Sequence, residues 1–352
     1  MLPNRFVLFS LAFLTTGSFV LPGQTLFRKP VKVLGDPNYI GTAASPTLYD
    51  GNGPNVVEGR ELSAPVAIAL DTSVSPPIVY ISDAGNNRVL GYQYGTQLKP
   101  GAMADVILGQ TDRFANLPLG PGTARSTGMN QPTGIAVDAS GNLYVADTLN
   151  NRILRYPRPM SQPSGSLQLP DMVIGQTSFN TRTTNAGGIS ATSLSLASAS
   201  SFVRTGIAFD PAGNLWVTDT LNNRILRYPA SGLKTGATAD LVIGQPDFTT
   251  ATATTNPLNK AGLNGPHALA FDPSGKLLVT DALNRLLVFA PPTASNVAAV
   301  RIAGIDSSSA STPATQIRLR NPFGVAGTSA GVVVADTGNN RVLLFPPVDS
   351  WP

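Results

Sequence analysis

The sequence predicts an all-β protein, a β-propeller of four-stranded antiparallel blades, and three observations support this fold class. A strand-rich motif recurs five times along the 352 residues. Apolar residues make up 42% of the chain, yet 34 glycines and 30 prolines interrupt them, as in folds built of many short strands. Charged residues make up only 12%, which leaves enough apolar sequence for a large core. Such self-similarity is typical of one repeat-built domain, which we expect over residues 26–352.

Each repeat contains three predicted strands joined by turn-forming residues. The second repeat reads Pro132-Thr-Gly-Ile-Ala-Val-Asp138, followed by Leu143-Tyr-Val-Ala-Asp-Thr-Leu-Asn-Asn-Arg-Ile-Leu-Arg-Tyr156. The five repeats start at Pro65, Pro132, Arg204, Pro266 and Pro322. A fourth strand is predicted after four of them, at Val106–Gln110, Val173–Gln176, Val242–Gln245 and, more weakly, Arg301–Gly304. Four antiparallel strands make one propeller blade.

These motifs resemble those of the NHL repeat family. That family repeats a Gly-Ile-Ala-Val-Asp strand, a Leu-Tyr-Val-Ala-Asp strand and an Asn-Arg-Ile strand, and the resemblance here covers nearly all of residues 31–347. It implies that each repeat folds as one blade. Members of the family often have six blades, whereas this sequence shows five repeats. We therefore expect five blades, with six as the alternative.

The segment Val31–Gly35 predicts how the ring closes. It reads as a fourth strand without a three-strand unit before it, while the fifth repeat reaches Phe345 without a fourth strand after it. Pairing of Val31–Gly35 with Arg341–Phe345 would complete the last blade and leave no exposed sheet edge.

The first 25 residues predict a secretory signal peptide. One positive charge at Arg5 precedes an apolar run, Phe6–Leu14, and smaller polar residues follow. The run is shorter than the roughly 20 residues of a membrane span, so we expect a secreted or periplasmic protein without a span once the signal is removed. The chain has no cysteine, which excludes disulfides and thiolate metal sites.

Strand alternation places two kinds of connection on one face of the propeller, the loops between blades and the turns between second and third strands. The long loops between blades are rich in Ser, Thr, Asn and Gly, and such loops commonly carry function. The turns carry an Asp and an Arg in every repeat, to which we assign a structural role because it is common to all blades. These residues are Asp83, Arg88, Asp147, Arg152, Asp219, Arg224, Asp281, Arg285, Asp336 and Arg341.

The candidate binding residues are those that differ between repeats at the start of the innermost strand. We expect them to crowd the mouth of the central channel: Gln131, Thr133, Arg204, Thr205, His267, Asn321 and Phe323. His267 is the only histidine of the chain, and the alternative for a lone histidine is a structural role. We identify no catalytic residue and no metal ligand.

Three function classes follow from these features. The first is a non-enzymatic scaffold that binds a protein, a peptide or a glycan on the loop face, since the sequence has no Gly-x-Ser-x-Gly elbow and no Walker-type loop. The second is an enzyme with its site at the channel mouth, because similar propellers include zinc-dependent lyases and calcium-dependent lactonase-like hydrolases. A zinc lyase of that kind needs several histidines, whereas this chain has His267 alone. The third is a purely architectural role.

The composition of the chain also limits which binding partners and cofactors we expect. The formal charge of +4 comes from 24 basic and 20 acidic residues spread along the chain without a basic run, which disfavours nucleic acid. We expect a monomer and no cofactor. A Ca²⁺ ion is compatible with the many Asp and Asn side chains, but no residue set singles out a site for it.

Overall fold

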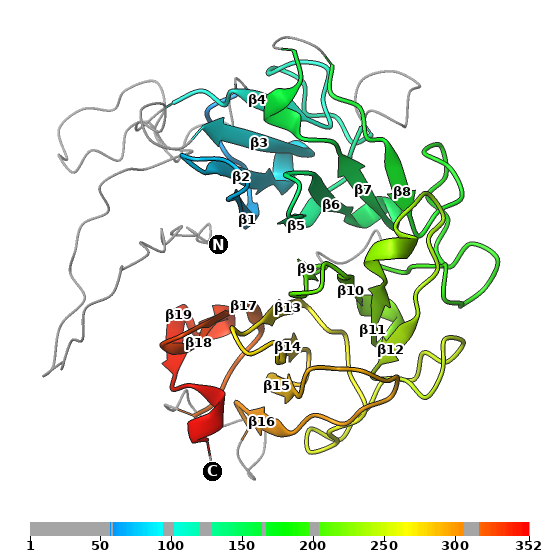
Figure 1. Ribbon diagram of the computed structural model, residues 1–352, viewed down its shortest axis with the longest axis vertical. Coiled ribbons are helices and arrows are strands. Elements are labelled where there is room, and N and C mark those ends of the chain that lie inside the picture. Colours follow the sequence, from blue (N-terminus) through cyan, green and yellow to red (C-terminus); the bar gives the residue numbers. More distant parts are fainter. Residues whose placement is uncertain are drawn as a thin grey trace, which may run out of the picture.

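A computed structural model describes residues 57, 59–93, 102–119, 128–163, 167–197, 204–305 and 317–351. These residues form an all-β propeller of five antiparallel sheets, which confirms the expected fold class and blade number (Figure 1). The predicted signal peptide, residues 1–25, lies outside the described residues, as does the predicted closing strand Val31–Gly35.

The first four blades each contain four strands in chain order. Blade 1 comprises β1 (Pro65–Asp71), β2 (Ile78–Asp83), β3 (Arg88–Gln93) and β4 (Val106–Leu108). Blade 2 comprises β5 (Pro132–Val137), β6 (Leu143–Asp147), β7 (Arg152–Tyr156) and β8 (Met172–Ile174). Blade 3 comprises β9 (Ile207–Phe209), β10 (Leu215–Asp219), β11 (Arg224–Tyr228) and β12 (Leu241–Ile243).

Blades 4 and 5 complete the described arc. Blade 4 comprises β13 (Ala268–Phe271), β14 (Leu277–Asp281), β15 (Arg285–Phe289) and β16 (Arg301–Ala303). Blade 5 comprises β17 (Pro322–Thr328), β18 (Gly331–Asp336) and β19 (Arg341–Phe345), and no fourth strand pairs with β19 among the described residues. The innermost strands β1, β5, β9, β13 and β17 contact one another in that order around the centre (Figure 1).

The core lies between neighbouring blades because alternate side chains of each strand point to opposite faces of the sheet. Between blades 2 and 3, for example, Tyr144 and Ile153 pack against Val217 and Leu226. Glycines let the innermost strands approach closely: a Cβ atom on Gly134 of β5 would lie 2.2 Å from the carbonyl oxygen of Thr205. Packing between blades thus fixes the position of each innermost strand.

The two ends of the arc expose apolar side chains that the same repeat positions bury elsewhere. Val342 on β19 is 52% exposed, whereas its counterparts Ile153 and Ile225 are 1% and 0% exposed. On β1, Ile68 is 43% exposed, whereas its counterpart Ile135 is 6% exposed. Among the residues that the structure describes, no neighbouring layer covers these two faces as it covers the corresponding faces of the inner blades.

Short 3₁₀ turns are the only helical elements of the described chain. They include Ala84–Asn86, Thr148–Asn150, Thr220–Asn222 and Thr337–Asn339 between second and third strands, and Pro159–Ser161, Ala230–Gly232 and Val348–Ser350 after third strands. Within the described residues, no helix has the length and apolar character needed to cross a membrane.

Candidate functional site

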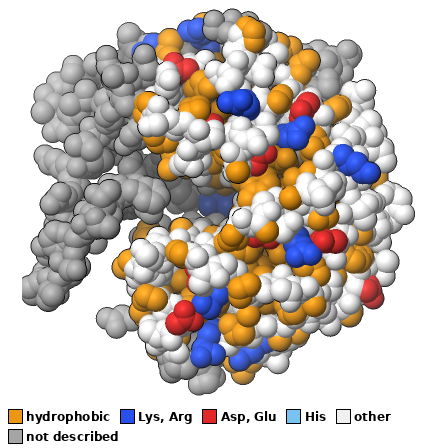
Figure 2. All heavy atoms as spheres, in the orientation of Figure 1, with side chains coloured by type: hydrophobic (Ala, Val, Ile, Leu, Met, Phe, Trp, Pro, Cys, Tyr) orange, Lys and Arg blue, Asp and Glu red, His pale blue; other side chains and the backbone are white. Residues whose placement is uncertain are grey.

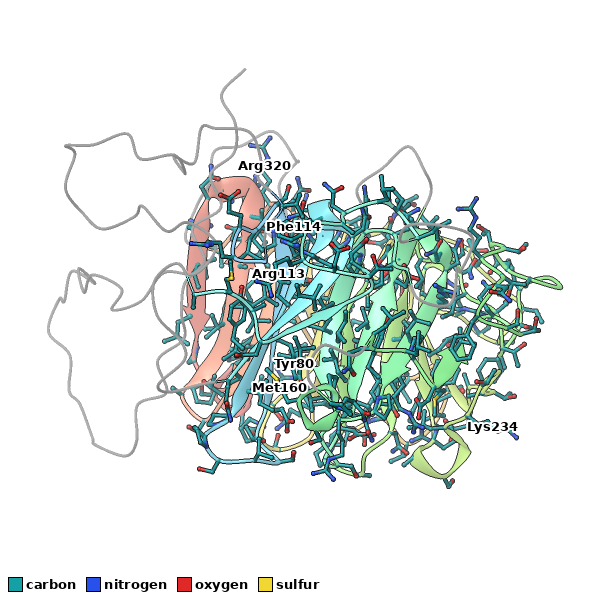
Figure 3. All side chains as sticks on the ribbon, turned by 90° about the horizontal axis from the view of Figure 1, so that it is seen from above. Tyr80, Arg113, Phe114, Met160, Lys234 and Arg320 are labelled. Carbon is teal, nitrogen blue, oxygen red and sulfur yellow. The ribbon has the colours of Figure 1, made fainter. Side chains whose placement is uncertain are left out.

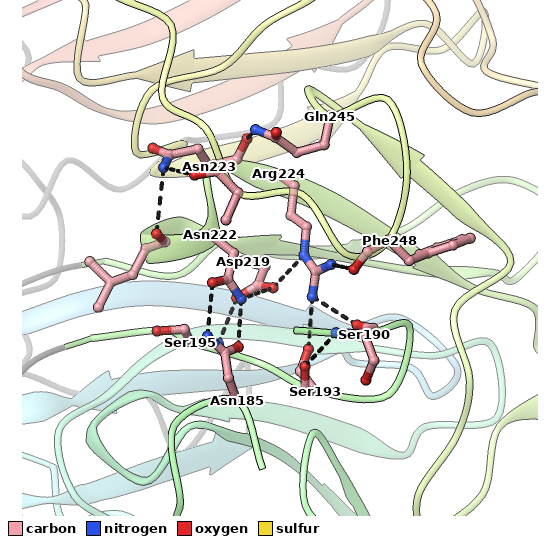
Figure 4. A network of polar contacts seen from close by, with 12 residues as sticks. Asn185, Ser190, Ser193, Ser195, Asp219, Asn222, Asn223, Arg224, Gln245 and Phe248 are labelled. Carbon is pink, nitrogen blue, oxygen red and sulfur yellow. Dashed lines mark hydrogen bonds and ion pairs between the residues drawn. The ribbon is translucent and has the colours of Figure 1, made fainter. Parts of the chain in front are cut away.

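The repeated Asp and Arg of each blade form a buried ion pair at the turn between the second and third strands. In blade 3, Nε of Arg224 donates to Oδ2 of Asp219 at 2.7 Å, and both side chains are fully buried (Figure 4). Asn222 donates to the same carboxylate at 2.8 Å, and the backbone N–H of Ser195 donates at 2.7 Å. The carboxylate thereby accepts several hydrogen bonds at once, as a buried charge requires.

The arginine of this pair joins the two long loops that flank its blade. Arg224 donates to the carbonyl of Phe248 in the following loop, and to those of Ser190 and Ser193 in the preceding loop at 2.9 and 3.1 Å (Figure 4). Arg88 likewise reaches the carbonyls of Arg113 and Glu61. These arginines therefore connect the loops between blades to the turns of the blades through hydrogen bonds.

The same pair recurs in the other blades with one variation. Arg88–Asp83 and Arg152–Asp147 have N–O distances of 2.7 Å, and Arg341–Asp336 has one of 2.6 Å. The turn of blade 4 is one residue shorter, and there Arg285 reaches both oxygens of Asp281. Burial raises the pKa of Asp83, Asp219 and Asp281, whereas the paired arginine and the hydrogen bonds lower it.

In blades 1 to 4, the asparagine before the repeated arginine connects its blade to the next, a role that the sequence analysis did not assign. Asn223 has a left-handed backbone, with φ of 53°, and its Oδ1 accepts from the N–H of Gly265 ahead of blade 4 at 2.9 Å. Asn87 accepts from Gln131 in the same way, and Asn284 from Asn321, both at 2.8 Å. The Asn-Asn pairs of the motif were a usable signal, since asparagine is the residue that best tolerates a left-handed backbone after glycine.

The glutamine that ends three of the four fourth-strand motifs is a second residue whose role the sequence analysis missed. Nε2 of Gln245 donates to the carbonyls of Asn223 and Thr252 at 2.8 and 2.9 Å. Gln110 and Gln176 make the equivalent contacts to Asn87 and Asn151. Glutamine therefore belongs to the scaffold of the loop face.

The two faces of the propeller are distinct in side view. Arg113, Phe114 and Arg320, all on connections between blades, lie toward one face, whereas Met160 and Lys234 lie toward the other (Figure 3). Figure 2 shows the molecule in the view of Figure 1, with basic and acidic side chains spread over the visible face and some of them next to each other.

Three of the candidate residues, from three successive blades, come together at the starts of the innermost strands. The guanidinium carbon of Arg204 lies 4.5 Å from the ring centroid of Phe323, and the ring of His267 meets that of Phe323 edge-on at 4.8 Å. Arg204 precedes β9, His267 precedes β13, and Phe323 is the second residue of β17. Arg204 thus extends past the start of blade 4 to reach blade 5.

His267 is held as a neutral imidazole. Burial, and second the nearby charge of Arg204, lower its pKa from 6.5 to about 4. Its Nδ1 atom is buried and has no hydrogen-bond partner among the described residues. Burial also lowers the pKa of Arg204, which nevertheless stays a cation at neutral pH.

The other four candidates belong to the frame of the mouth. Thr133 and Thr205 join blades 2 and 3, since the N–H of Thr205 donates to Oγ1 of Thr133 at 3.0 Å. Gln131 and Asn321, each with a left-handed backbone, donate to the asparagines of the preceding blades through their N–H groups. Within the described part of the chain, no ring contact or hydrogen bond links the side chains of Gln131 and Asn321 to the cluster of Arg204, His267 and Phe323, so the structure brings together only part of the predicted set.

The described residues contain no group of three His, Cys, Asp or Glu side chains arranged to hold a metal ion. The recurring aspartates are instead engaged by their arginines. The cluster itself combines one cation, one neutral imidazole and one aromatic ring.

The chain is therefore a β-propeller in which the arginines of the turns hydrogen-bond to the loops between blades. Residues 129–156, which span blade 2 up to the end of β7, match the family model described as the NHL repeat. The chain is thus a β-propeller in which one blade matches the NHL repeat. A search of curated protein sequences finds no significant match.

Three solved structures are similar to this chain at low sequence identity. A streptogramin B lyase is 11% identical, with a TM-score of 0.42, over 84% of this chain and 71% of its own. Virginiamycin B lyase from Staphylococcus aureus is 16% identical, with a TM-score of 0.41, over 84% and 82%. An auxiliary nutrient binding protein from Bacteroides thetaiotaomicron is 13% identical, with a TM-score of 0.48, over 80% and 59%.

Proposed function

We propose that this chain is a non-enzymatic binding scaffold that recognises a protein, peptide or glycan through its loop face, with the channel mouth at the centre of the site. The observation that supports this function is the contact among Arg204, His267 and Phe323. Repeat positions that served only the scaffold would carry similar residues in each blade. Here His267 and Phe323 occupy one repeat position and Arg204 the position before it, and these unlike residues meet in space, as in a recognition site.

The scaffold beneath this cluster is suited to binding rather than to large rearrangement. Innermost strands packed at backbone contact position the three side chains, and the buried arginines fasten the surrounding loops. A rigid frame lowers the entropy that a protein loses when it orders its binding groups around a ligand. An aromatic ring beside polar donors suits ligands with both apolar and polar surface.

Exposed apolar side chains on the same loops extend the surface available to a partner. Phe114 is 69% exposed, Leu117 57% and Leu258 66%. All three belong to connections between blades, on the side where the Asp–Arg turns lie. Aromatic and apolar side chains of this kind supply most of the free energy in protein and peptide interfaces.

We also propose that the protein works outside the cytoplasm, as a secreted or periplasmic protein. The support is the apolar run Phe6–Leu14 behind Arg5, a pattern of secretory signals.

A binding screen tests this function. Purified protein is applied to a glycan array and used in pull-downs, each with and without Ca²⁺, beside the variant Phe323→Ala. We expect saturable binding to a defined ligand that Phe323→Ala weakens. Turnover of a lactone or a peptide substrate that is abolished by substitutions at the channel mouth would overturn the proposal in favour of an enzyme.

A further inference from the structure

The loops that follow the fourth strands of blades 1, 2 and 3 are held by the same backbone contacts. In each blade the turn arginine donates to the carbonyl of the third residue after the loop's glutamine, which is Arg113, Phe179 or Phe248. The asparagine before that arginine donates to the sixth carbonyl, that of Asn116, Arg182 or Ala251. The glutamine itself donates to the seventh, that of Leu117, Thr183 or Thr252. The three loops can therefore be compared position by position.

Blade 1 differs from the other two blades in the side chains that its loop exposes. The fourth residue after the glutamine is exposed in all three loops, and it is Phe114 in blade 1 but Asn180 and Thr249 in blades 2 and 3. The seventh residue is also exposed in all three, and it is Leu117 in blade 1 but threonine in the other two. Since polar residues occupy both positions on the same contacts elsewhere, the fold of the loop does not require an apolar pair there.

The residue before Phe114 replaces a packed ring by a cation. Phe179 and Phe248 hold this position in blades 2 and 3, and both pack against the core between blades. Arg113 holds it in blade 1, where its side chain is exposed. Its Nη1 donates to the sulfur of Met103 at 3.1 Å, a weak acceptor, and the ion pairs of the described residues do not include it.

The loop holds these side chains in place without a partner. Oδ1 of Asp112 accepts from the backbone N–H groups of Phe114 and Ala115 at 2.8 and 3.0 Å, which closes a turn at the start of the loop. The carbonyl contacts to the scaffold fix the rest of it. A loop that is already ordered loses little conformational entropy when it binds.

The chemistry of this loop suits a protein partner better than a lipid surface or a glycan. Two apolar side chains on one loop, with polar residues at the same positions of the next two loops, are a compact anchor rather than the wide apolar face that lies on a membrane. The neighbouring charges of Asp112 and Arg113 form no basic cluster for anionic lipid. A pocket in a protein can bury an aromatic ring and a leucine and can place a carboxylate opposite a guanidinium.

We propose that residues 112–117 are an anchor that inserts Phe114 and Leu117 into an apolar pocket of a protein partner, with Arg113 facing an acidic group at the rim of that pocket. This inference rests on the proposed binding function and names the class of partner. Arg113 and Phe114 lie toward the same face of the propeller as Arg320, on the loop between blades 1 and 2 (Figure 3).

Site-specific photo-cross-linking identifies the partner. The full-length protein carries p-benzoylphenylalanine in place of Phe114 and is irradiated in the cells that naturally make it. The same replacement of Asn180 and of Thr249 gives two matched controls, because these residues occupy the equivalent exposed position. We expect a cross-linked protein from position 114 that is absent from positions 180 and 249. Mass spectrometry names this protein, which is then purified and used as the probe in titrations.

Variants copied from the neighbouring loops test the anchor itself. Phe114→Asn and Leu117→Thr introduce the residues that blade 2 carries on the same contacts, so both should keep the wild-type thermal midpoint. We expect each to weaken binding of the purified partner at least about ten-fold, as for an anchor buried in a pocket. Arg113→Met should lower the dependence of the affinity on salt. Thr249→Asn is the control and should bind like wild type.

Equal affinity of wild type, Phe114→Asn and Leu117→Thr for the purified partner overturns the inference. So does the absence of a cross-linked protein at position 114, or the same product from positions 114, 180 and 249. A lower thermal midpoint of Phe114→Asn with unchanged affinity assigns the ring to the fold and overturns it as well.

Two further results separate this inference from the proposed function. Binding that needs Phe114 but is made to vesicles of phosphatidylcholine and phosphatidylglycerol, with no protein partner, overturns the class of partner. A partner that needs Phe323 but not Phe114 overturns the anchor while leaving the binding function in place.

Discussion

Arg204 lies over the ring of Phe323, 4.5 Å from its centroid, although the two residues belong to blades 3 and 5. The contact joins parts of the chain that no local pattern relates, and it passes the start of blade 4 at His267. Arg204 and His267 both contact Phe323, so the contact links the starts of blades 3, 4 and 5.

The first prediction concerns the strength of this contact. A double-mutant cycle with Arg204→Met and Phe323→Leu is expected to give a coupling free energy of about 0.5–2 kcal/mol, because a partly desolvated cation on an aromatic ring is worth that much. Urea denaturation of the four proteins measures it. Additive effects of the two substitutions would show that the ring does not hold the guanidinium.

The second prediction concerns pH. The pKa of His267 is lowered from 6.5 to about 4 by burial and by Arg204, so above pH 6.5 the imidazole is neutral in both the folded and the unfolded state. As the pH falls from about 6.5 to about 4, the unfolded state takes up the proton first, and the free energy of unfolding decreases by up to about 3 kcal/mol. Below pH 4 this contribution changes no further.

Comparison with His267→Gln isolates this effect from the carboxylates, which titrate near the same pH. The difference in unfolding free energy between wild type and variant should change between pH 7 and pH 4.5 by guanidinium denaturation. A difference that stays constant over this range would contradict a buried neutral imidazole.

The third prediction concerns the buried ion pair of Asp219 and Arg224. Asp219→Asn leaves Arg224 buried without its counter-charge and should lower the free energy of unfolding by about 3–5 kcal/mol. Asp240→Asn is the matched control, because its pair with Arg227 is at the surface and is worth about 0–1 kcal/mol. Equal thermal shifts for the two variants would show that the pair does not anchor the loop face.

The fourth prediction concerns ring closure by Val31–Gly35, which lies outside the described residues. Strand pairing in blade 2 sets Ile153 opposite Ile174, just before Gly175. By the same register Leu34, just before Gly35, should lie opposite Val342 of β19. In the native chain Val342 is 52% exposed among the described residues, as expected if its partner strand is the one that is not described. Because the chain has no cysteine, the double variant Leu34→Cys and Val342→Cys should form one intramolecular disulfide between the two strands.

The disulfide is read by mass spectrometry and by mobility on non-reducing gels. The pair Lys32→Cys and Val342→Cys is the out-of-register control and should remain largely reduced. Crosslinking between molecules, or none in either pair, would contradict closure by this strand.

Much of the fold could be predicted from the sequence because each blade repeats the same local pattern. The third strand of blade 2, for instance, was expected to end at Tyr156 and does. Fourth strands are shorter than expected: β4 ends at Leu108 because Gly109 turns the chain with φ of 86°. A glycine at a fixed place after the strand was the available signal.

The site was less predictable because its contacts cross between repeats. Alternation placed Arg204, His267 and Phe323 near the mouth, but only the packing of three blades shows that they touch. The bridging role of Asn223 also depends on a backbone N–H of the next blade, at Gly265, which no sequence spacing specifies.

The measurement that tests the central claim most directly compares ligand affinity across the two faces of the propeller. Isothermal titration of a ligand found by the array is carried out with wild type, with Phe323→Ala at the mouth, and with Lys234→Ala on the opposite face. A binding scaffold centred on the channel mouth predicts at least about ten-fold weaker binding for Phe323→Ala and wild-type affinity for Lys234→Ala. Unchanged affinity in Phe323→Ala, or a loss confined to Lys234→Ala, would contradict it.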